Sequence, residues 1–413
     1  MNSAAQDNNA GTMRWWRRLA RNRLLDVSVG LLSLLCVVRL AGRLPDRAVH
    51  DDYAQYHLSS RLVMEGRNPY TTAFGPMSVG GGVVFRPDIP SATNPPGLLW
   101  LFAPFVLLPV RGAFWVWVAM EAASLAVILW LTRVLLRDRL SRRGWWFVCA
   151  AAVSSSAVFW NFHFSQVQLL LAALVLTAFH LRQTGRSTAA CVVAAIAGAM
   201  KLYPLVLLPW FVWGSDGDGA KRWRRLAWAT GSSGLLVLVT GPALWQGFVE
   251  SGMPILQRCA IGPTYFNFTV TSLASNLGAL AGNARAGWLA GAVASVALWV
   301  LIYAVCWRGL PDAAAQFSLL CVGMLACGVT TWGHYLVFLI FPLAWLAMQV
   351  ARRPSPGGVV LCGLLFLTLN DLDTWAGPVL DRHIHLKILV NFVPLYGMLA
   401  LGGWLVAKLW RRS

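Results

Sequence analysis

Charge is scarce in this sequence, and negative charge is the scarcest. Only 12% of the 413 residues are charged, and only 16 are Asp or Glu. A soluble domain carries about twice that charged fraction. The composition therefore excludes an ordinary water-soluble globular protein, and each acidic side chain that is present needs a physical explanation.

A disulfide framework and a cleavable signal peptide are also missing. Most of the eight cysteines lie inside apolar segments, and only Cys259 falls in a segment expected outside the membrane. That distribution differs from the paired cysteines of a secreted scaffold. The run from Leu24 to Leu44 follows a basic flank and lacks a small-residue cleavage site, so we interpret it as the first membrane helix.

Apolar residues are abundant. They make up 57% of the chain and recur in runs from Leu24 to Leu409. Runs of ~20 apolar residues cross a bilayer as helices, because backbone polar groups in lipid must bond internally. The sequence therefore predicts an all-α, polytopic integral membrane protein with about 12 transmembrane helices, outer-face loops and interfacial helices. We expect a single transmembrane domain over 24–408, between cytoplasmic tails at 1–23 and 409–413.

The net charge of +18 raises the alternative of nucleic-acid binding, but the basic residues are arranged as in a membrane protein. They occur in short tracts between apolar runs: Arg14, Arg17, Arg18, Arg21 and Arg23; Arg137, Arg139, Arg142 and Arg143; Lys221, Arg222, Arg224 and Arg225; Arg352 and Arg353; Lys408, Arg411 and Arg412. Such tracts mark cytoplasmic loops and contact anionic lipids. We predict a bacterial inner-membrane protein with both termini in the cytoplasm, no nucleic-acid partner, and outer loops at about 45–97, 246–285 and 371–385.

Titratable side chains are concentrated on the side predicted to face outward. Nine of the 16 acidic residues and six of the seven histidines fall there. Two short apolar hairpins, at 145–181 and 187–213, have polar tips around Gln166 and Lys201. We expect these tips to face a cavity in the outer half of the membrane. The sequence thus predicts chemistry at the outer face.

Two adjacent carboxylates, Asp51 and Asp52, begin a helical stretch where the chain leaves the membrane. They indicate either an N-terminal cap for a helix starting near Tyr53 or a general base at the membrane surface. A single base suits transfer from a lipid-phosphate sugar, because a phosphate leaves without needing an acid to protonate it. A short interfacial helix is expected at Ser59–Glu65.

Lys201 and His334 are candidates for binding such a phosphate. Lys201 either extends toward the interface or provides a point charge for phosphate. His334 either packs at a helix end or contacts the phosphate. Glu121 lies within a membrane span, which makes it a functional candidate of undefined role. No His and carboxylate spacing requires a metal ion, so we predict no cofactor and leave metal dependence open.

Six motifs follow one another in a recognisable order. They are Asp52-Tyr53-x-x-Tyr56, Glu65-Gly66-x-Asn68-Pro69-Tyr70, Asn94-Pro95-Pro96, Ser165-Gln166-Val167-Gln168-Leu169-Leu170, Lys201-Leu202-Tyr203-Pro204 and Thr331-Trp332-Gly333-His334. From Asp51 to Tyr335 the chain resembles glycosyltransferase family 87, integral-membrane transferases of the GT-C class. The resemblance implies a GT-C fold.

The resemblance also implies a reaction. A hexose, with mannose the first expectation, is transferred with inversion from a polyprenyl-phosphate sugar to a hydroxyl of an envelope glycolipid or glycan. Asp52 is then the base, and His334 holds the donor phosphate with Lys201 nearby. Further candidates for substrate contacts are Asp51, Tyr56, Tyr70, Asn94, Gln166, Tyr203, Asn267, His383 and His385.

The chain departs from the family pattern at two places. Family members usually carry Gly-Gln-x-Asn where this chain has Ser165-Gln166-Val167-Gln168. They often carry a second His or an acid around the Trp-x-His position, where His334 stands alone. Two other functions stay open: a transporter or flippase of lipid-linked sugars, which needs no base, and a structural assembly subunit.

Overall fold

The computed structural model describes residues 23–43, 51–72, 92–136, 140–213, 219–260, 267–308, 312–352, 356–368 and 390–410. Within these ranges the chain is helical and contains no strand, which confirms the predicted all-α class. The segment 371–385, with His383 and His385, lies outside the described residues. So do most of both predicted tails and the side chain of Asp51.

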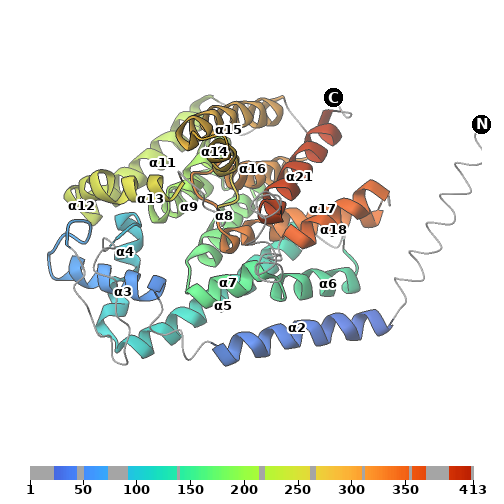
Figure 1. Ribbon diagram of the computed structural model, residues 1–413, viewed down its shortest axis with the longest axis horizontal. Coiled ribbons are helices and arrows are strands. Elements are labelled where there is room, and N and C mark those ends of the chain that lie inside the picture. The colour runs from blue at the N-terminus through green and yellow to red at the C-terminus, as the bar shows by residue number, and fades with distance from the viewer. Residues whose placement is uncertain are drawn as a thin grey trace, which may run out of the picture.

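The helices are mostly short and follow one another with few residues between them (Figure 1). In chain order they are α2 (Arg23–Arg43), α3 (Asp51–Met64), α4 (Pro96–Phe102), η2 (Ala103–Leu107), α5 (Val110–Leu136), α6 (Arg142–Val153), α7 (Ser156–Phe164), α8 (Gln168–Gln183), α9 (Ser187–Met200), η3 (Tyr203–Leu207), α10 (Leu208–Val212), α11 (Gly219–Thr240), α12 (Pro242–Gly247), η4 (Phe248–Gly252), α13 (Met253–Ala260), α14 (Val270–Leu280), α15 (Ala284–Trp307), α16 (Ala313–Ala326), η5 (Gly333–Leu339), α17 (Ile340–Arg352), α18 (Pro356–Thr368) and α21 (Val393–Trp410).

Helix length and composition identify a membrane protein. Among the described residues, α5, α15 and the continuous pair η5–α17 are long and apolar enough to cross a bilayer. The bent pair α6–α7 and the bent segment 219–257 raise that number to five if each is one span. Other apolar helices, such as α8 and α9, have 16 and 14 residues. The count of about 12 spans stays a prediction.

The core is centred on α8, which packs against α5, α9 and η5 (Figure 1). Its side chain Phe179 stacks on Phe317 of α16 with ring centroids 4.2 Å apart, and Phe341 of α17 lies edge-on at 5.5 Å. The long helix α2 lies along the bottom of Figure 1, beside α6 and α7. The polar tip that precedes α8 is therefore held by the most tightly packed part of the molecule.

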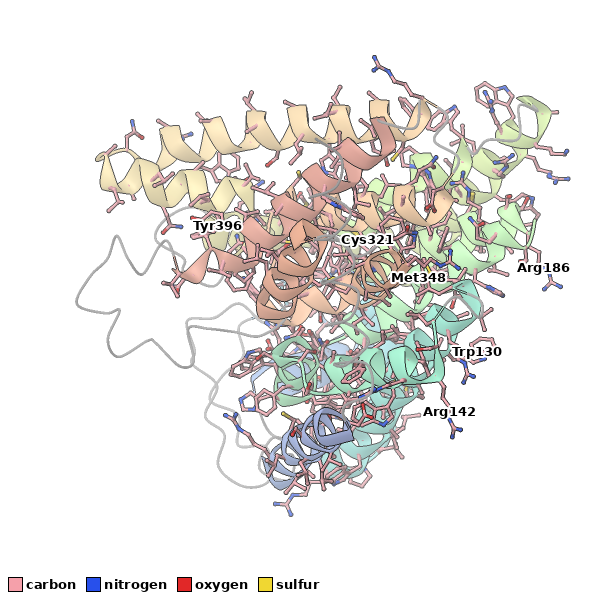
Figure 2. All side chains as sticks on the ribbon, turned by 90° about the vertical axis from the view of Figure 1, so that its right-hand side faces the viewer. Trp130, Arg142, Arg186, Cys321, Met348 and Tyr396 are labelled. Atoms are coloured by element: carbon pink, nitrogen blue, oxygen red, sulfur yellow. The ribbon has the colours of Figure 1, made fainter. Side chains whose placement is uncertain are left out.

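Two arginines at helix ends lie on the same edge of the molecule. Figure 2 shows Arg142, at the start of α6, and Arg186, between α8 and α9, at one edge, with Tyr396 of α21 toward the opposite edge. The side of the membrane that each edge faces stays a prediction.

Helix α3 differs from its prediction. A short interfacial helix was expected at Ser59–Glu65, but the helix begins at Asp51, and Tyr53, Tyr56 and Ser60 are buried. The polar residues along α3 suggested a helix at the membrane surface, whereas many of its side chains are buried. Ser60 Oγ, for example, donates a hydrogen bond to the Leu99 carbonyl of α4 at 2.7 Å. Asp52 thus lies in the first turn of a packed helix.

A close contact between α4 and α9 positions the Lys201 tip. A Cβ atom on Gly97 would lie 2.5 Å from the carbonyl oxygen of Ala199, closer than carbon and oxygen can approach. The glycine therefore lets α4 cross the end of α9, two residues before Lys201. The tip predicted at Lys201–Pro204 is confirmed in position, since α9 ends at Met200.

This contact generates the first prediction. Gly97→Ala should lower the free energy of unfolding by about 1–3 kcal/mol, because the added methyl group displaces backbone. The measurement is thermal unfolding of the purified protein in detergent. Gly112→Ala on α5 is the control, because a Cβ there meets nothing within 4 Å. Equal melting temperatures for the two variants would contradict the prediction.

Candidate functional site

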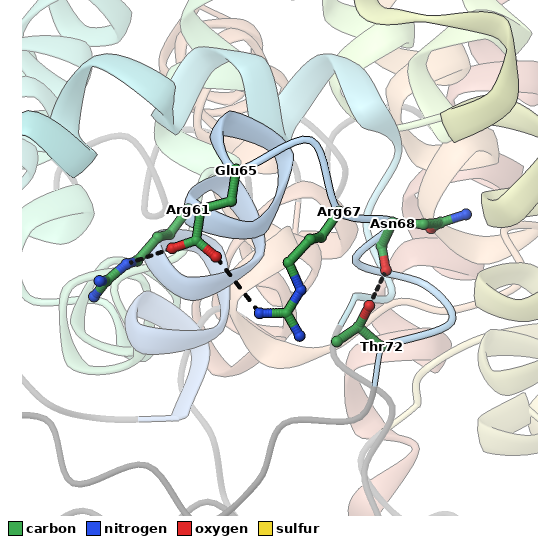
Figure 3. Close-up of polar contacts among 5 residues, drawn as sticks. All are labelled: Arg61, Glu65, Arg67, Asn68 and Thr72. Atoms are coloured by element: carbon green, nitrogen blue, oxygen red, sulfur yellow. Dashed lines mark hydrogen bonds and ion pairs between the residues drawn. The ribbon is translucent and has the colours of Figure 1, made fainter.

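The Glu65–Tyr70 motif forms the end of α3. Gly66 has φ of +70°, a conformation that favours glycine, and Arg67 N donates to the Leu62 carbonyl at 2.8 Å to close the helix. Glu65 pairs with Arg61 at 3.0 Å and with Arg67 at 3.5 Å (Figure 3). All three side chains are well exposed, so water screens these pairs and they add little stability.

Asn68 and Tyr70 act as a brace rather than as an open binding surface. Asn68 Oδ1 accepts from the Tyr70 amide at 2.9 Å, and its carbonyl accepts from Thr72 Oγ1 at 2.7 Å (Figure 3). Tyr70 is buried against Phe248, and its hydroxyl donates to the Asn94 carbonyl at 2.6 Å. The two motifs around Tyr70 and Asn94 are therefore bonded to each other. Tyr70, a candidate for substrate contact, is buried and packs against Phe248.

A chain of hydrogen bonds joins Asp52 to the tip before α8. Gln166 Nε2 donates to Asp52 Oδ2 at 2.6 Å, and Gln166 Oε1 accepts from the Tyr56 hydroxyl at 2.9 Å. The orientation of the amide follows from its partners, since a carboxylate can only accept and the phenol donates. Asp52 is partly exposed, whereas Gln166 and Tyr56 are buried. Two buried side chains thus orient one accessible carboxylate.

The tyrosine in this chain keeps its proton. Burial, followed by the nearby charge of Asp52, raises the pKa of Tyr56 well above its usual value. A protonated phenol donates to Gln166 throughout the physiological pH range. The amide of Gln166 is therefore held with its NH₂ group directed at Asp52.

The tip itself has a strained conformation that other residues stabilise. Ser165 has φ of +51°, a left-handed conformation that glycine adopts more easily. Trp117 Nε1 on α5 donates to the Ser165 carbonyl at 3.1 Å. The backbone N–H of Gln166 donates to the Asn161 carbonyl at 2.8 Å. The family pattern has glycine at this position, and Ser165 adopts a backbone conformation that glycine favours.

A cavity of about 310 Å³ opens beside Lys201. Its polar lining includes Asn94, Lys201, Tyr203 and Tyr335, and its apolar lining includes Leu202, Val206, Leu256, Trp299 and Met324. Lys201 Nζ lies 3.5 Å from the Tyr335 hydroxyl and 5.4 Å from the centre of its ring. One end of the cavity is therefore cationic and polar while much of its wall is apolar.

Tyr335 connects this cavity to Asp52. It is close enough to Tyr56 to add to the rise in the Tyr56 pKa, and its ring lies 5.1 Å from that of Tyr203. Tyr335 thus contacts Lys201 and Tyr203 and lies within electrostatic range of Tyr56, the partner of Gln166. Tyr335 was not among the predicted site residues. Its position directly after His334 was the signal in the sequence.

His334 lies within the protein, beside this group. It is 4% exposed, and its ring lies against Tyr335, Trp332 and Phe164. Asn161 Nδ2 donates to the His334 carbonyl at 2.7 Å, which fastens η5 to the tip before α8. The Nε2 atom of the His334 ring has no hydrogen-bond partner within the described part of the chain. This nitrogen is enclosed by its neighbours, and His334 does not line the Lys201 cavity, so a ligand reaches the nitrogen only if the surrounding side chains move.

Asn267 is placed as a second brace. Its Oδ1 accepts from the Thr331 amide at 2.7 Å, and its Nδ2 donates to the Val329 carbonyl at 3.1 Å. Both bonds shape the 328–331 segment, part of which lines the Lys201 cavity. Its side chain is fully buried. Asn267 therefore supports the cavity wall, although it was predicted as a substrate contact.

The groups so assembled can accept a proton and bind an anion. Among the described residues no cluster of His, Cys, Asp and Glu could hold a metal ion. In this arrangement Asp52 can accept a proton, and Lys201 provides a positive charge for an anion.

The sequence also matches a known family. The model of glycosyltransferase family 87 matches residues 92–331, more than half of the chain. A search of curated proteins finds no match. The matched region contains Asn94, Gln166 and Lys201 and is flanked by the helices that carry Asp52 and His334. The chain belongs to glycosyltransferase family 87 and is a membrane glycosyltransferase.

Proposed function

We propose that this glycosyltransferase transfers a hexose, with mannose the first candidate, from a polyprenyl-phosphate sugar to a hydroxyl of an envelope glycolipid or glycan. The transfer inverts the anomeric centre and takes place at the outer face of the inner membrane. One observation carries the proposal: Gln166, itself bonded to Tyr56, orients the Asp52 carboxylate, and Tyr335, which lies within electrostatic range of Tyr56, contacts Lys201 at the cationic end of a largely apolar cavity.

The chemistry uses both ends of this link. The acceptor oxygen attacks the anomeric carbon of the donor while Asp52 takes the proton of the acceptor hydroxyl. The bond from the anomeric carbon to the phosphate oxygen breaks, and the polyprenyl phosphate leaves with the electron pair. Lys201 stabilises the negative charge that develops on the phosphate. His334 Nε2 supplies a second polar contact for the phosphate.

The apolar wall favours a lipid-linked donor over a nucleotide sugar. Leu202, Val206, Leu256, Trp299 and Met324 provide apolar surface for the first isoprene units of the lipid. A nucleotide would place a charged, polar group against the same surface, which costs free energy.

Asp52→Asn tests the base. The amide cannot accept the proton, so turnover should fall by about 10²–10⁴-fold while expression and melting temperature are retained. The assay incubates purified protein with polyprenyl-phosphate mannose and a glycolipid acceptor, and measures glycosylated product and free polyprenyl phosphate. Glu65→Gln, an exposed acid beyond the end of the same helix, is the matched control and should be fully active.

Two outcomes of that assay would count against the proposal. Substantial turnover in Asp52→Asn would transfer the role of base to Asp51 or another group. Movement of intact donor between leaflets without any product in the wild-type protein would indicate a transporter.

Lys201→Met tests the cation. The side chain keeps its length and loses its charge, so kcat/KM for the donor should fall by about 10–100-fold, the value of a hydrogen bond to a charged group. Lys201→Arg should recover part of the loss because it restores the charge. Arg67→Gln, which removes an exposed charge, is the control. Wild-type kinetics in Lys201→Met would exclude a role in phosphate binding.

Gln166→Leu tests the orientation of the base. Removing the amide donor takes away a hydrogen bond to the charged carboxylate, so the acid limb of the pH–rate profile should move to higher pH. The plateau rate should fall as well, since Asp52 is no longer held in one position. A profile identical to that of the wild type would show that the 2.6 Å bond has no part in catalysis.

A further inference from the structure

One face of α5 carries two buried polar side chains that both point to the tip before α8. Trp117 and Glu121 are four residues apart, so they lie one above the other on the helix. Trp117 is fully buried and bonds the Ser165 carbonyl, and Glu121 is 1% exposed. Neither residue lines the Lys201 cavity. The reaction described above assigns no role to Glu121.

The carboxyl group of Glu121 faces a helix end that lacks its own cap. Helix α8 begins at Gln168, and its N-cap residue, Val167, has no side-chain oxygen. The first bond within the helix runs from the Leu171 amide to the Val167 carbonyl at 3.0 Å, which leaves the preceding amides without an acceptor in the helix. Two of these amides, of Leu169 and Leu170, are within interaction range of the Glu121 carboxyl group.

The surroundings of Glu121 explain why a carboxyl group is present in an apolar helix. Its two oxygens have no hydrogen-bond partner of normal geometry among the described residues. A buried carboxyl group is costly unless its oxygens meet hydrogen-bond donors. The first amides of a helix are donors without an acceptor in the helix, and a carboxyl oxygen can serve them in either protonation state. Glu121 is also within electrostatic range of Tyr56, the donor to Gln166.

We propose that Glu121 is a positioning residue for the active site. Its carboxyl group complements the start of α8 and, together with the Trp117 bond, holds the Ser165–Gln168 tip in its left-handed conformation. Gln166 then reaches Asp52 and Tyr56 at once. The catalytic consequence rests on the proposed function of Asp52, whereas the effect on the tip does not.

Hydrogen exchange of the protein in lipid nanodiscs tests the effect on the tip. Glu121→Leu should increase exchange at least about tenfold in a peptide covering Leu169 and Leu170, because their amides lose the carboxyl group. Glu121→Gln retains an oxygen acceptor and should exchange within about threefold of the wild type. Thr132→Val is the matched control, since Thr132 is a buried polar residue three turns further along α5, away from the tip.

Kinetics test the consequence for catalysis. Glu121→Leu should lower kcat by at least about tenfold with a smaller change in KM, and Glu121→Gln should recover most of the loss. The double variant Glu121→Leu/Gln166→Leu should be no slower than Gln166→Leu alone, because both changes remove the same orientation of Asp52.

The outcomes separate the two proposals. Unchanged exchange and unchanged kcat in Glu121→Leu would overturn the positioning role. So would a Glu121→Gln variant as inactive as Glu121→Leu with wild-type exchange, since that would indicate proton transfer by Glu121 itself. Activity in Asp52→Asn, with faster exchange in Glu121→Leu, would refute the proposed base and leave the role of Glu121 at the tip supported.

Discussion

The hydrogen bond from Gln166 to Asp52 is the interaction on which the rest of the site depends. It joins residues 114 positions apart in the sequence and links α3 to the tip that precedes α8. The Tyr56 hydroxyl donates to the Oε1 atom of Gln166, which fixes the orientation of the side-chain amide and directs its NH₂ group at Asp52. Without the bond from Gln166, the partly exposed carboxylate would lose a buried partner that fixes its orientation.

Burial of polar groups explains how this bond is maintained. In a membrane protein few water molecules are available to satisfy a misplaced amide or hydroxyl group, so each polar group is committed to a protein partner. Ser165 tolerates its left-handed backbone because Trp117 bonds its carbonyl. Asn161 bonds the carbonyl of His334 and so ties two segments of the site. A single substitution at one of these residues therefore leaves a buried polar group without its partner, which lowers stability.

Close contacts then hold the segments around the site together. Gly97 permits α4 to cross α9 just before Lys201, and Gly247 leaves room for the side chain of Asn68. Tyr70 fastens the Asn94 segment to the end of α3. Several family motifs therefore hold the backbone around the site in place, and which of their side chains touch substrate stays a prediction.

The sequence by itself determined the class of protein and the chain breaks near Gln166 and Lys201, because apolar run length and Pro or polar breaks act locally. It did not show that the arm before Gln166 is two helices, α6 and α7, bent by 43°. Only the tertiary structure showed which of the candidate side chains bond to the protein's own backbone. Tyr70 and Asn267, predicted as substrate contacts, bond other parts of the backbone, whereas Tyr335, which was missed, contacts Lys201 from 134 positions away. A side chain's partner depends on how helices cross, and no local pattern records that crossing.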